Sequence, residues 1–383
     1  MKAPIKPAEA RLAYVDGLRA LAVLGVVLSH AGKYTLDLQP AAPLYHALAE
    51  GSHGVDLFFV ISGLCLSYPT LARLQRAGEA GFDAGRYAAH RIVRIVPPYW
   101  MAFGVVLVVA LAMLKLGFSL PWPTVIIPAP AYALRELFFI GGSGNLVGSF
   151  WTLAVEFRWY FLFPVLLWLW ARARPAFFAA GLLALCAYHF TPLHIIDFAA
   201  LPAFMLGIVA ADWAIFGNKL NAWAPLLFLA AVVASLFLEP GHLRYAYQDQ
   251  IWWQVACFFL VVAGCTNAVL RGALSIRPLV AIGVASYSIY LMHDPVMAWY
   301  GLYGGHDLFA DIALGLLAGF AFFLVWERWF VTKPVKPMLT DALQRWIERI
   351  AAKVGLVRLA FPVSRPAQPA PLVSASEPVA PEA

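Results

Sequence analysis

The stretch GLRALAVLGVVLSHAG, Gly17–Gly32, is apolar along most of its length, yet it contains Arg19 near its start and His30 near its end. These two residues are about three helical turns apart, so they project from nearly the same face of a helix. At about 1.5 Å per residue they are separated by about 16 Å along the axis. Asp16, one turn before Arg19, can pair with it. The stretch therefore predicts a membrane helix with an ionisable group near each end.

The composition of the whole chain is that of a membrane protein. Of its 383 residues, 62% are hydrophobic and 13% are charged, whereas a soluble domain is about half apolar and about a quarter charged. Apolar runs of about 20 residues, the length that crosses a bilayer, predict an all-α polytopic fold with about ten spans. The proline-rich segment 119–140 is expected at the membrane interface or as a re-entrant segment. The spans are predicted near 14–32, 54–71, 96–117, 149–171, 175–192, 195–217, 222–239, 251–270, 279–303 and 308–331.

The basic residues fall mostly on one side of this topology. If the N-terminus is cytoplasmic and the spans alternate, the outward loops contain only Lys33, Arg135 and Arg244, while the inward segments contain most of the others. Cytoplasmic loops carry such an excess of lysine and arginine, so both termini are predicted to be cytoplasmic. Three regions are expected: a membrane domain over 11–332, an amphipathic basic helix on the cytoplasmic membrane surface over 333–361, and a disordered tail rich in Pro and Ala over 362–383.

Three further ionisable residues fall at about the depth of His30. By the same residue count, Asp56, Glu156 and His293 lie in the outer half of the membrane. Ionisable residues within spans usually face a bundle interior or a cavity, so these four residues are predicted to form a catalytic acid–base cluster. Each also has a simpler interpretation. These are an interfacial position for His30, a helix cap for Asp56, an ion pair of Glu156 with Arg158 or Arg135, and an outer-end position for His293 and Asp294.

A second group of candidates lies at the cytoplasmic end. In HRIVRIVPPYW, Arg91 and Arg94 are one helical turn apart, just before the prolines expected to start the third span. Arginine pairs bind phosphate well, so Arg91 and Arg94 are predicted to bind an anionic ligand, and Arg19 lies at the same end of the membrane. The alternative is ordinary enrichment of arginine at the cytoplasmic side, with Arg19 extending to the interface. Neither a glycine-rich nucleotide loop nor a metal-ligand spacing is present, and no metal site is predicted.

Five motifs occur in order along the chain: YVDGLRALAVLGVVLSH with Arg19 and His30, GVDLFFVISG with Asp56, RIVRIVPPYW with Arg91 and Arg94, FWTLAVEFRWYFLFP with Glu156, and SYSIYLMHDPV with His293. In this order they resemble the acyltransferase 3 family of bacterial inner-membrane O-acyltransferases, over about residues 11–332. Thr152 stands where the fourth motif commonly has serine. The resemblance implies a multi-pass protein of the bacterial inner membrane.

The resemblance also implies a reaction. In that family an acyl group, usually acetyl, passes from cytosolic acyl-CoA to a hydroxyl of an acceptor, with the first-helix histidine essential and the arginines engaging the CoA. Acyl-CoA is thus a donor substrate, and no permanently bound cofactor is expected. His30 is expected to act as general base, oriented by Glu156 or Asp56, while a covalent acyl-histidine intermediate stays open.

The identity of the acceptor is the least determined part of this prediction. An extracytoplasmic or lipid-linked glycan is the expected acceptor, with a macrolide or a similar small molecule as the alternative. A membrane transporter is the alternative from another class, because ionisable residues within spans also mark transport pathways. Transporters often contain repeated halves, and the sequence shows no internal repeat.

Overall fold

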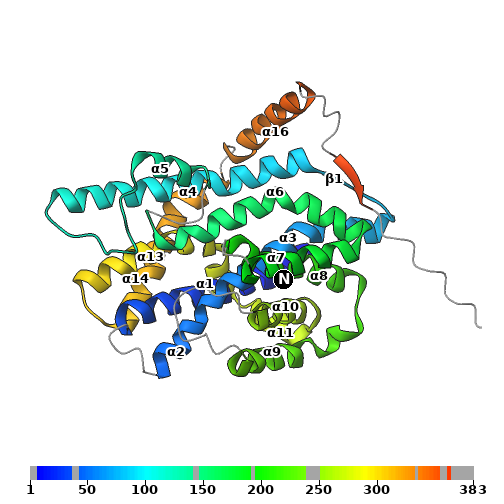
Figure 1. The fold of residues 1–383 in the computed structure, drawn as a ribbon, viewed down its shortest axis with the longest axis horizontal. Helices are drawn as coiled ribbons and strands as arrows, with labels where there is room; N and C mark the ends of the chain where they lie inside the picture. Colours follow the sequence, from blue (N-terminus) through cyan, green and yellow to red (C-terminus); the bar gives the residue numbers. More distant parts are fainter. Residues whose placement is uncertain are drawn as a thin grey trace, which may run out of the picture.

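The computed structural model describes residues 7–36, 43–140, 146–190, 195–238, 251–332, 335–353 and 360–363. Nearly all of these residues are helical (Figure 1). The helical segments are α1 (Pro7–Leu36), α2 (Pro43–Ala49), η1 (Glu50–His53), α3 (Gly54–Ala77), α4 (Ala84–Lys115), α5 (Pro130–Leu137), η2 (Gly148–Phe150), α6 (Trp151–Arg172), α7 (Arg174–Phe190), α8 (Ile196–Phe216), η3 (Lys219–Trp223), α9 (Ala224–Leu238), α10 (Ile251–Thr266), α11 (Ala268–Leu274), α12 (Arg277–Val284), α13 (Ser286–Tyr303), α14 (Leu308–Phe322), the π-helical η4 (Phe323–Glu327), α15 (Arg328–Thr332) and α16 (Val335–Lys353). The two strands in the described part are β1 (Ala80–Asp83) and β2 (Ala360–Val363).

The described helices include seven segments that are long and apolar enough to cross a membrane, or nine if each of two bent pairs counts as one span. The bent pairs are α10–α11, with a 99° bend, and α12–α13, with a 71° bend. These nine segments and α7, a helix of 17 residues, occupy the ten predicted spans. The predicted all-α, multi-pass membrane fold is therefore confirmed.

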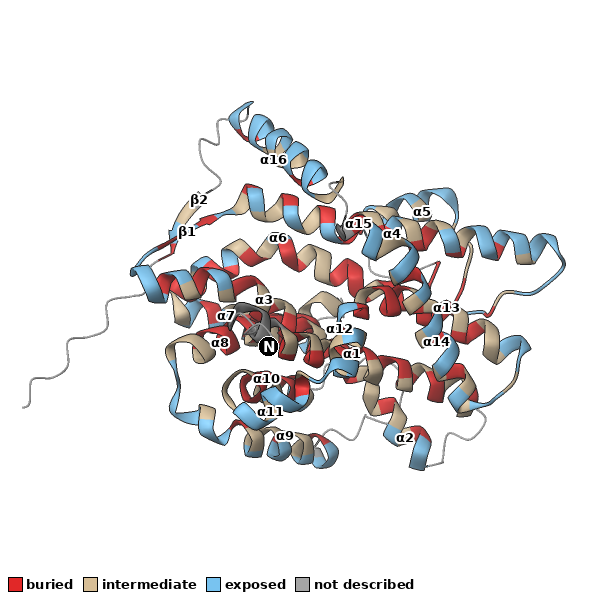
Figure 2. Cartoon of the chain, turned by 180° about the vertical axis from the view of Figure 1, so that it is seen from behind, coloured by how far each residue is buried: buried red, intermediate tan, exposed pale blue. Residues whose placement is uncertain are grey.

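The outward faces of the helices expose large apolar side chains, as contact with lipid requires. In α9, Leu226, Leu229, Val233 and Phe237 recur every three or four residues and are between 52% and 81% exposed. Figure 2 shows the buried residues on the sides of the helices that face one another. In water such a stripe would favour association, whereas in a bilayer it faces acyl chains.

Helix α4 begins earlier than predicted. The sequence places the start of this span near residue 96, but the helix begins at Ala84 and continues through the proline pair 97–98. Asp83 caps it by accepting a backbone hydrogen bond of 2.9 Å from the first turn. Membrane helices tolerate internal prolines because neighbouring groups satisfy the freed carbonyls. The added turns, about three in number, place Arg91 and Arg94 within one continuous helix.

The segment predicted to be interfacial or re-entrant does not form a spanning helix. Within 119–140 the structure has one short helix, α5, preceded by turns and an isolated bridge between Val125 and Val147. Residues 141–145 lie outside the described part of the chain. Thr124, next to this bridge, reaches the candidate active site described below.

Close helix packing depends on two glycines where α3 meets α8, the most extensive helix–helix contact in the described part. A Cβ atom on Gly63 would lie 2.1 Å from the Phe204 carbonyl oxygen, and one on Gly207 would lie 2.1 Å from the Val60 carbonyl oxygen. Small residues let membrane helices approach backbone to backbone, because no side chain separates them. This contact fixes the position of α3, which contributes one wall of the candidate active site.

We expect Gly207→Ala to lower the thermal midpoint of unfolding. The added Cβ must push α3 and α8 apart, and overpacking of this kind costs about 1–3 kcal/mol. Gly104→Ala in α4 is the matched control, because a Cβ there meets no atom within 4 Å. Fluorescence-detected size exclusion after heating, in one detergent, compares the two variants. Equal midpoints would contradict the close approach of α3 and α8.

The C-terminal segment runs back along α4. Helix α16 packs against α4, and β2 pairs antiparallel with β1 just before α4 begins (Figures 1 and 2). A helix thus occupies most of the region predicted as amphipathic and basic, and Trp346 and Ile350 are exposed on it. Residues Ala360–Val363, which cross the predicted boundary with a disordered tail, form a strand instead. Residues 354–359 and 364–383 lie outside the described part, and the cytoplasmic location of the helix stays a prediction.

Candidate active site

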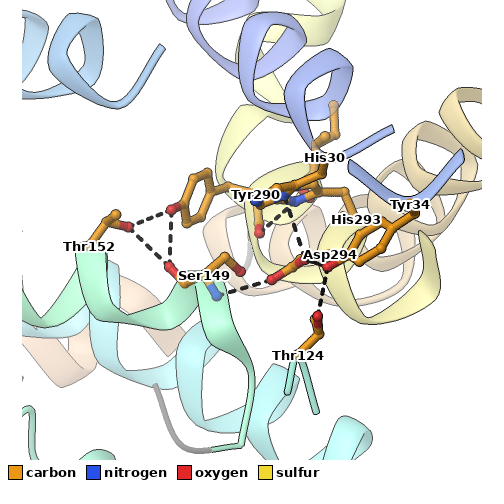
Figure 3. A network of polar contacts seen from close by, with 9 residues as sticks. His30, Tyr34, Thr124, Ser149, Thr152, Tyr290, His293 and Asp294 are labelled. Carbon is orange, nitrogen blue, oxygen red and sulfur yellow. Dashed lines mark hydrogen bonds and ion pairs between the residues drawn. The ribbon is translucent and has the colours of Figure 1, made fainter. Parts of the chain in front are cut away.

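Two of the predicted catalytic residues meet between α1 and α13. His30 Nδ1 lies 2.8 Å from His293 Nε2, and the two rings stack with their centroids 4.9 Å apart (Figure 3). His293 is fully buried, whereas the His30 side chain is 21% exposed. The residue count along two separate spans placed both residues at one depth, and helix packing brings their rings into contact.

Backbone carbonyls determine which nitrogens of this pair carry protons. His293 Nδ1 lies 3.0 Å from the Ile289 carbonyl oxygen and 2.9 Å from that of Tyr290. Carbonyl oxygens only accept, so His293 Nδ1 carries a proton, and in the neutral ring Nε2 is an acceptor. His30 Nδ1–H then donates to His293 Nε2, which leaves the lone pair of His30 on Nε2. Among the described residues no group hydrogen-bonds to that nitrogen, so it can accept a proton from a substrate.

Asp294 completes this group. Its Oδ1 lies 3.5 Å from His30 Nδ1 and accepts a 2.5 Å hydrogen bond from the Tyr34 hydroxyl. Its Oδ2 accepts a 3.0 Å hydrogen bond from Ser149 N–H at the start of α6. Thr124 hydrogen-bonds Tyr34 from the other side, at 3.0 Å. The carboxylate is 2% exposed and therefore acts as a fixed negative charge that can stabilise a protonated His30.

The structure pairs Asp56 with a different histidine. Its Oδ2 lies 2.8 Å from His53 Nδ1, one turn earlier, and the indole of Trp253 in α10 stacks on the His53 ring at 4.9 Å. Asp56 itself is fully buried. The carboxylate beside His30 in this structure is that of Asp294, because the first turn of α3 directs the Asp56 carboxylate toward η1 and α10.

Glu156 likewise lies apart from the histidine pair. It accepts hydrogen bonds from the hydroxyls of Ser62 and Tyr160, the latter at 2.5 Å. Ser149 is at the level of Asp294, and Glu156 lies seven residues further along α6, about 10 Å deeper. Arg158, the ion-pair partner considered for Glu156, instead forms a two-point salt bridge with Asp197, at 2.6 and 2.8 Å. Glu156 thus belongs to the wall of a cavity rather than to the histidine group.

The three predicted arginines line that same cavity. Arg19 from α1 pairs with Asp16 at 2.6 Å, and Arg91 and Arg94 approach from α4. Neither Arg91 nor Arg94 forms a salt bridge with any described residue, and Arg91 Nε is buried without a hydrogen-bond partner there. Arg91 lies 5.9 Å from the ring centroids of both Tyr87 and Tyr160. Unpaired guanidinium groups beside a cavity are the arrangement that an anionic ligand requires.

The cavity extends from the arginines toward the histidine pair, although neither histidine lines it. Its lining extends from the arginines past Glu156 and Ser62 to Thr152 and Tyr290. Tyr290 and Thr152 hydrogen-bond each other at 2.6 Å, and the Tyr290 ring lies 5.6 Å from that of His293 (Figure 3). A ligand whose anionic end lies at the arginines can therefore direct its other end toward His293 and His30.

Sequence reasoning gave Asp294 only the role of an outer-end polar residue and overlooked Tyr34 and Ser149. The available signal was the dipeptide His293–Asp294 itself, two ionisable residues in succession in an apolar span. Tyr34 is one turn beyond His30 and therefore shares its face of α1. The backbone N–H of Ser149 has no sequence signature at all.

Comparisons with known proteins identify the family of the chain. The family model described as "Acyltransferase domain" matches residues 12–326. O-acetyltransferase OatA of Staphylococcus aureus is 26% identical over 330 residues, covering 76% of this chain and 51% of its own. The exopolysaccharide production protein ExoZ of Rhizobium meliloti is 29% identical over 309 residues, covering 74% of this chain and 90% of its own.

The chain spans about half the length of the OatA proteins, so the activity of those whole proteins is not transferred to it. No solved structure matches the chain. The family match covers almost all of the membrane region, including both the histidine pair and the arginines. This chain belongs to the acyltransferase 3 family and is a multi-pass membrane acyltransferase.

Proposed function

We propose that this protein transfers an acyl group, most simply acetyl, from cytosolic acyl-CoA to a hydroxyl of an extracytoplasmic or lipid-linked glycan in the bacterial inner membrane. The observation that carries the proposal is the cavity with unpaired arginines at one end and the His30–His293 pair beyond the other. The family assignment supports acyl transfer, and the geometry supports a donor with an anionic head and a reactive tail.

The donor end of the proposal depends on Arg91 and Arg94. CoA carries several phosphates at one end and its thioester at the other. Arginine forks bind phosphate through parallel charge-assisted hydrogen bonds. Arg91 and Arg94 form no salt bridge with the described residues, although Glu327 lies within electrostatic range of Arg94, and Arg91 Nε has no hydrogen-bond partner among them. The apolar and tyrosine-lined walls beyond them suit the less polar arm of the donor.

The chemistry at the other end follows from the tautomers of the histidine pair. His30 Nε2 removes the proton of the acceptor hydroxyl as its oxygen attacks the thioester carbonyl. Asp294 stabilises the imidazolium that forms, since its Oδ1 lies 3.5 Å from His30 Nδ1. When the carbon–sulfur bond breaks, the thiolate of CoA takes up that proton. The ester is released on the acceptor, and His30 returns to its neutral form.

The acceptor class is supported by the names of the relatives and by the topology. OatA is named an O-acetyltransferase, and ExoZ is named an exopolysaccharide production protein. The distribution of basic residues supports a cytoplasmic position for Arg91 and an outward position for His30. An acceptor that approaches from outside would then meet the acyl group at His30. A secreted small molecule could approach in the same way and is the alternative acceptor.

The acceptor is tested by comparing cells with and without this protein. Surface glycans, membrane lipids and culture medium are extracted separately and analysed by mass spectrometry and NMR for ester groups that mild base removes. An ester on a glycan that appears only with the protein is the expected result. An ester confined to a small molecule in the medium would favour the alternative acceptor, and no new ester in any fraction would contradict the proposal.

We expect the double variant Arg91→Ala, Arg94→Ala to weaken acetyl-CoA binding at least about tenfold, because two charge-assisted phosphate contacts are lost. Equilibrium binding of radiolabelled acetyl-CoA to purified protein measures the effect. Arg345→Ala, Arg349→Ala is the matched control, since it removes two exposed arginines from α16. An unchanged dissociation constant in the first variant would remove these arginines from the donor site.

A further inference from the structure

The C-terminal segment lies beside the proposed donor site, although it is beyond the family match, which ends at residue 326. Lys336, in the first turn of α16, lies within electrostatic range of Arg91 and Arg94. Asp341, further along α16, lies within that range of His90, which is further toward the start of α4. The strand after α16 then pairs with β1, which immediately precedes α4. Helix α16 therefore runs antiparallel to α4, with its first turn over the arginines.

This register is held at both ends of the segment. The register of β1 and β2 runs from Ala80 opposite Val363 to Asp83 opposite Ala360. The Phe82 and Phe361 rings lie 5.3 Å apart, and Phe82 is 5% exposed. Along the helix, the side chains of Thr340 and Ala351 are buried. Lys336 is thus kept beside Arg91 and Arg94 by a strand pairing and a helix contact, rather than by its own charge, which those arginines repel.

The charges around Lys336 do not balance. Burial, together with Arg94 and Arg91, lowers the pKa of Lys336, and Glu327 is the one carboxylate that opposes this shift. Glu327 Oε2 already accepts a 2.5 Å hydrogen bond from Ser288. Like charges held together in a partly buried site destabilise one another until an anion lies between them. Arg91 Nε also has no hydrogen-bond partner among the described residues, and an anion at this site would provide one.

We propose that Lys336 is a phosphate-binding residue, and that α16 is therefore part of the acyl-donor site. This inference rests on the proposed function, since it assigns the phosphates to the nucleotide end of acyl-CoA. A lysine binds phosphate as a mobile point charge, whereas the arginines beside it supply fixed forks. Lys336 lies at the arginine end, far from His30, so it acts on donor affinity and not on the chemical step. A lipid headgroup phosphate shares this chemistry and is distinguished by the test.

The test measures donor binding to the full-length protein in nanodiscs that contain only phosphatidylcholine. Lys336→Ala is expected to raise the dissociation constant of radiolabelled acetyl-CoA about five- to tenfold, and Lys336→Arg is expected to restore it. Pantetheine has the reactive arm of the donor but no nucleotide phosphates, and it competes with acetyl-CoA for the site. Its inhibition constant, corrected for the acetyl-CoA affinity of each variant, is expected to be the same in Lys336→Ala and Lys336→Arg. Lys353→Ala, an exposed lysine at the far end of α16, is the matched control.

Two results would overturn the proposal. The dissociation constant of acetyl-CoA could be unchanged in Lys336→Ala, or Lys353→Ala could raise it equally. If the constant is unchanged and Lys336→Ala weakens the association of the solubilised protein with phosphatidylglycerol vesicles, the phosphate belongs to a lipid. The proposed function fails separately, in the unsubstituted protein, if that protein does not bind acetyl-CoA.

Discussion

His30→Ala is expected to lower ester formation at least about a hundredfold, because general base catalysis by a positioned histidine contributes about 10²–10⁴ in rate. The geometry gives His30 this role and not His293. Both nitrogens of His293 are engaged, Nδ1 with backbone carbonyls and Nε2 with His30, whereas His30 Nε2 is available. The measurement is the amount of base-labile ester per cell at matched amounts of membrane protein.

Two further variants separate loss of the base from loss of structure. His30→Asn places an amide N–H₂ near the position of Nδ1 and so keeps a donor toward His293 Nε2, but it cannot accept a proton, so it should be as inactive as His30→Ala while retaining the thermal midpoint. His189→Ala, an exposed histidine at the end of α7, is the control for removing a histidine elsewhere. More than about a tenth of the original activity in His30→Asn would be incompatible with a base at this position.

The same variants bear on the covalent alternative. If the acyl group rests on His30 during the reaction, rapid denaturation near neutral pH of the protein with labelled acetyl-CoA and no acceptor, followed at once by peptide mass spectrometry, should show label on the peptide that contains His30. His30→Asn would lose that label together with activity. Absence of label in an active protein favours direct transfer to the acceptor hydroxyl. Both routes use His30, so neither outcome alters the first prediction.

Depth in the membrane was the part of the site that the sequence could predict. A helix rises about 1.5 Å per residue, so counting from the end of a span gives the level of each side chain. That count brought His30 and His293 to one level and separated them from Arg19, as the structure has them, but it also put Glu156 at the level of His30, whereas Glu156 lies about 10 Å deeper in the cavity wall. The ten apolar segments followed from composition and length for the same one-dimensional reason.

Lateral position was the part that the sequence could not predict. Which residues meet at one level depends on helix rotation, and that is set by contacts such as Gly63 against Gly207, which no single span reveals. Asp56 therefore meets His53, although it was expected near His30. Asp294 follows His293 directly in the chain, but its importance becomes visible only when Tyr34 and Ser149 are placed around it.

Asp294→Asn is expected to reduce ester formation at least about tenfold while leaving the dissociation constant of acetyl-CoA unchanged. The neutral amide no longer stabilises the His30 imidazolium, and its N–H₂ group faces donors where the carboxylate accepted hydrogen bonds. The contact with His30, at 3.5 Å, is longer than a direct hydrogen bond, so the loss should be smaller than that of His30→Ala. Acetyl-CoA binding is preserved because the arginines lie at the other end of the cavity.

Two comparisons decide whether the charge of Asp294 causes this loss. Tyr34→Phe removes one hydrogen bond but keeps the carboxylate, and it should therefore reduce activity less than Asp294→Asn does. Asp311→Asn alters a second carboxylate of the outer half, which is buried in α14 and has no hydrogen-bond partner among the described residues. It should keep activity and raise the thermal midpoint, because a buried unpaired carboxylate is costly. If Tyr34→Phe is as inactive as Asp294→Asn at an equally lowered midpoint, Asp294 serves packing, and the stabilising charge for His30 must come from another group.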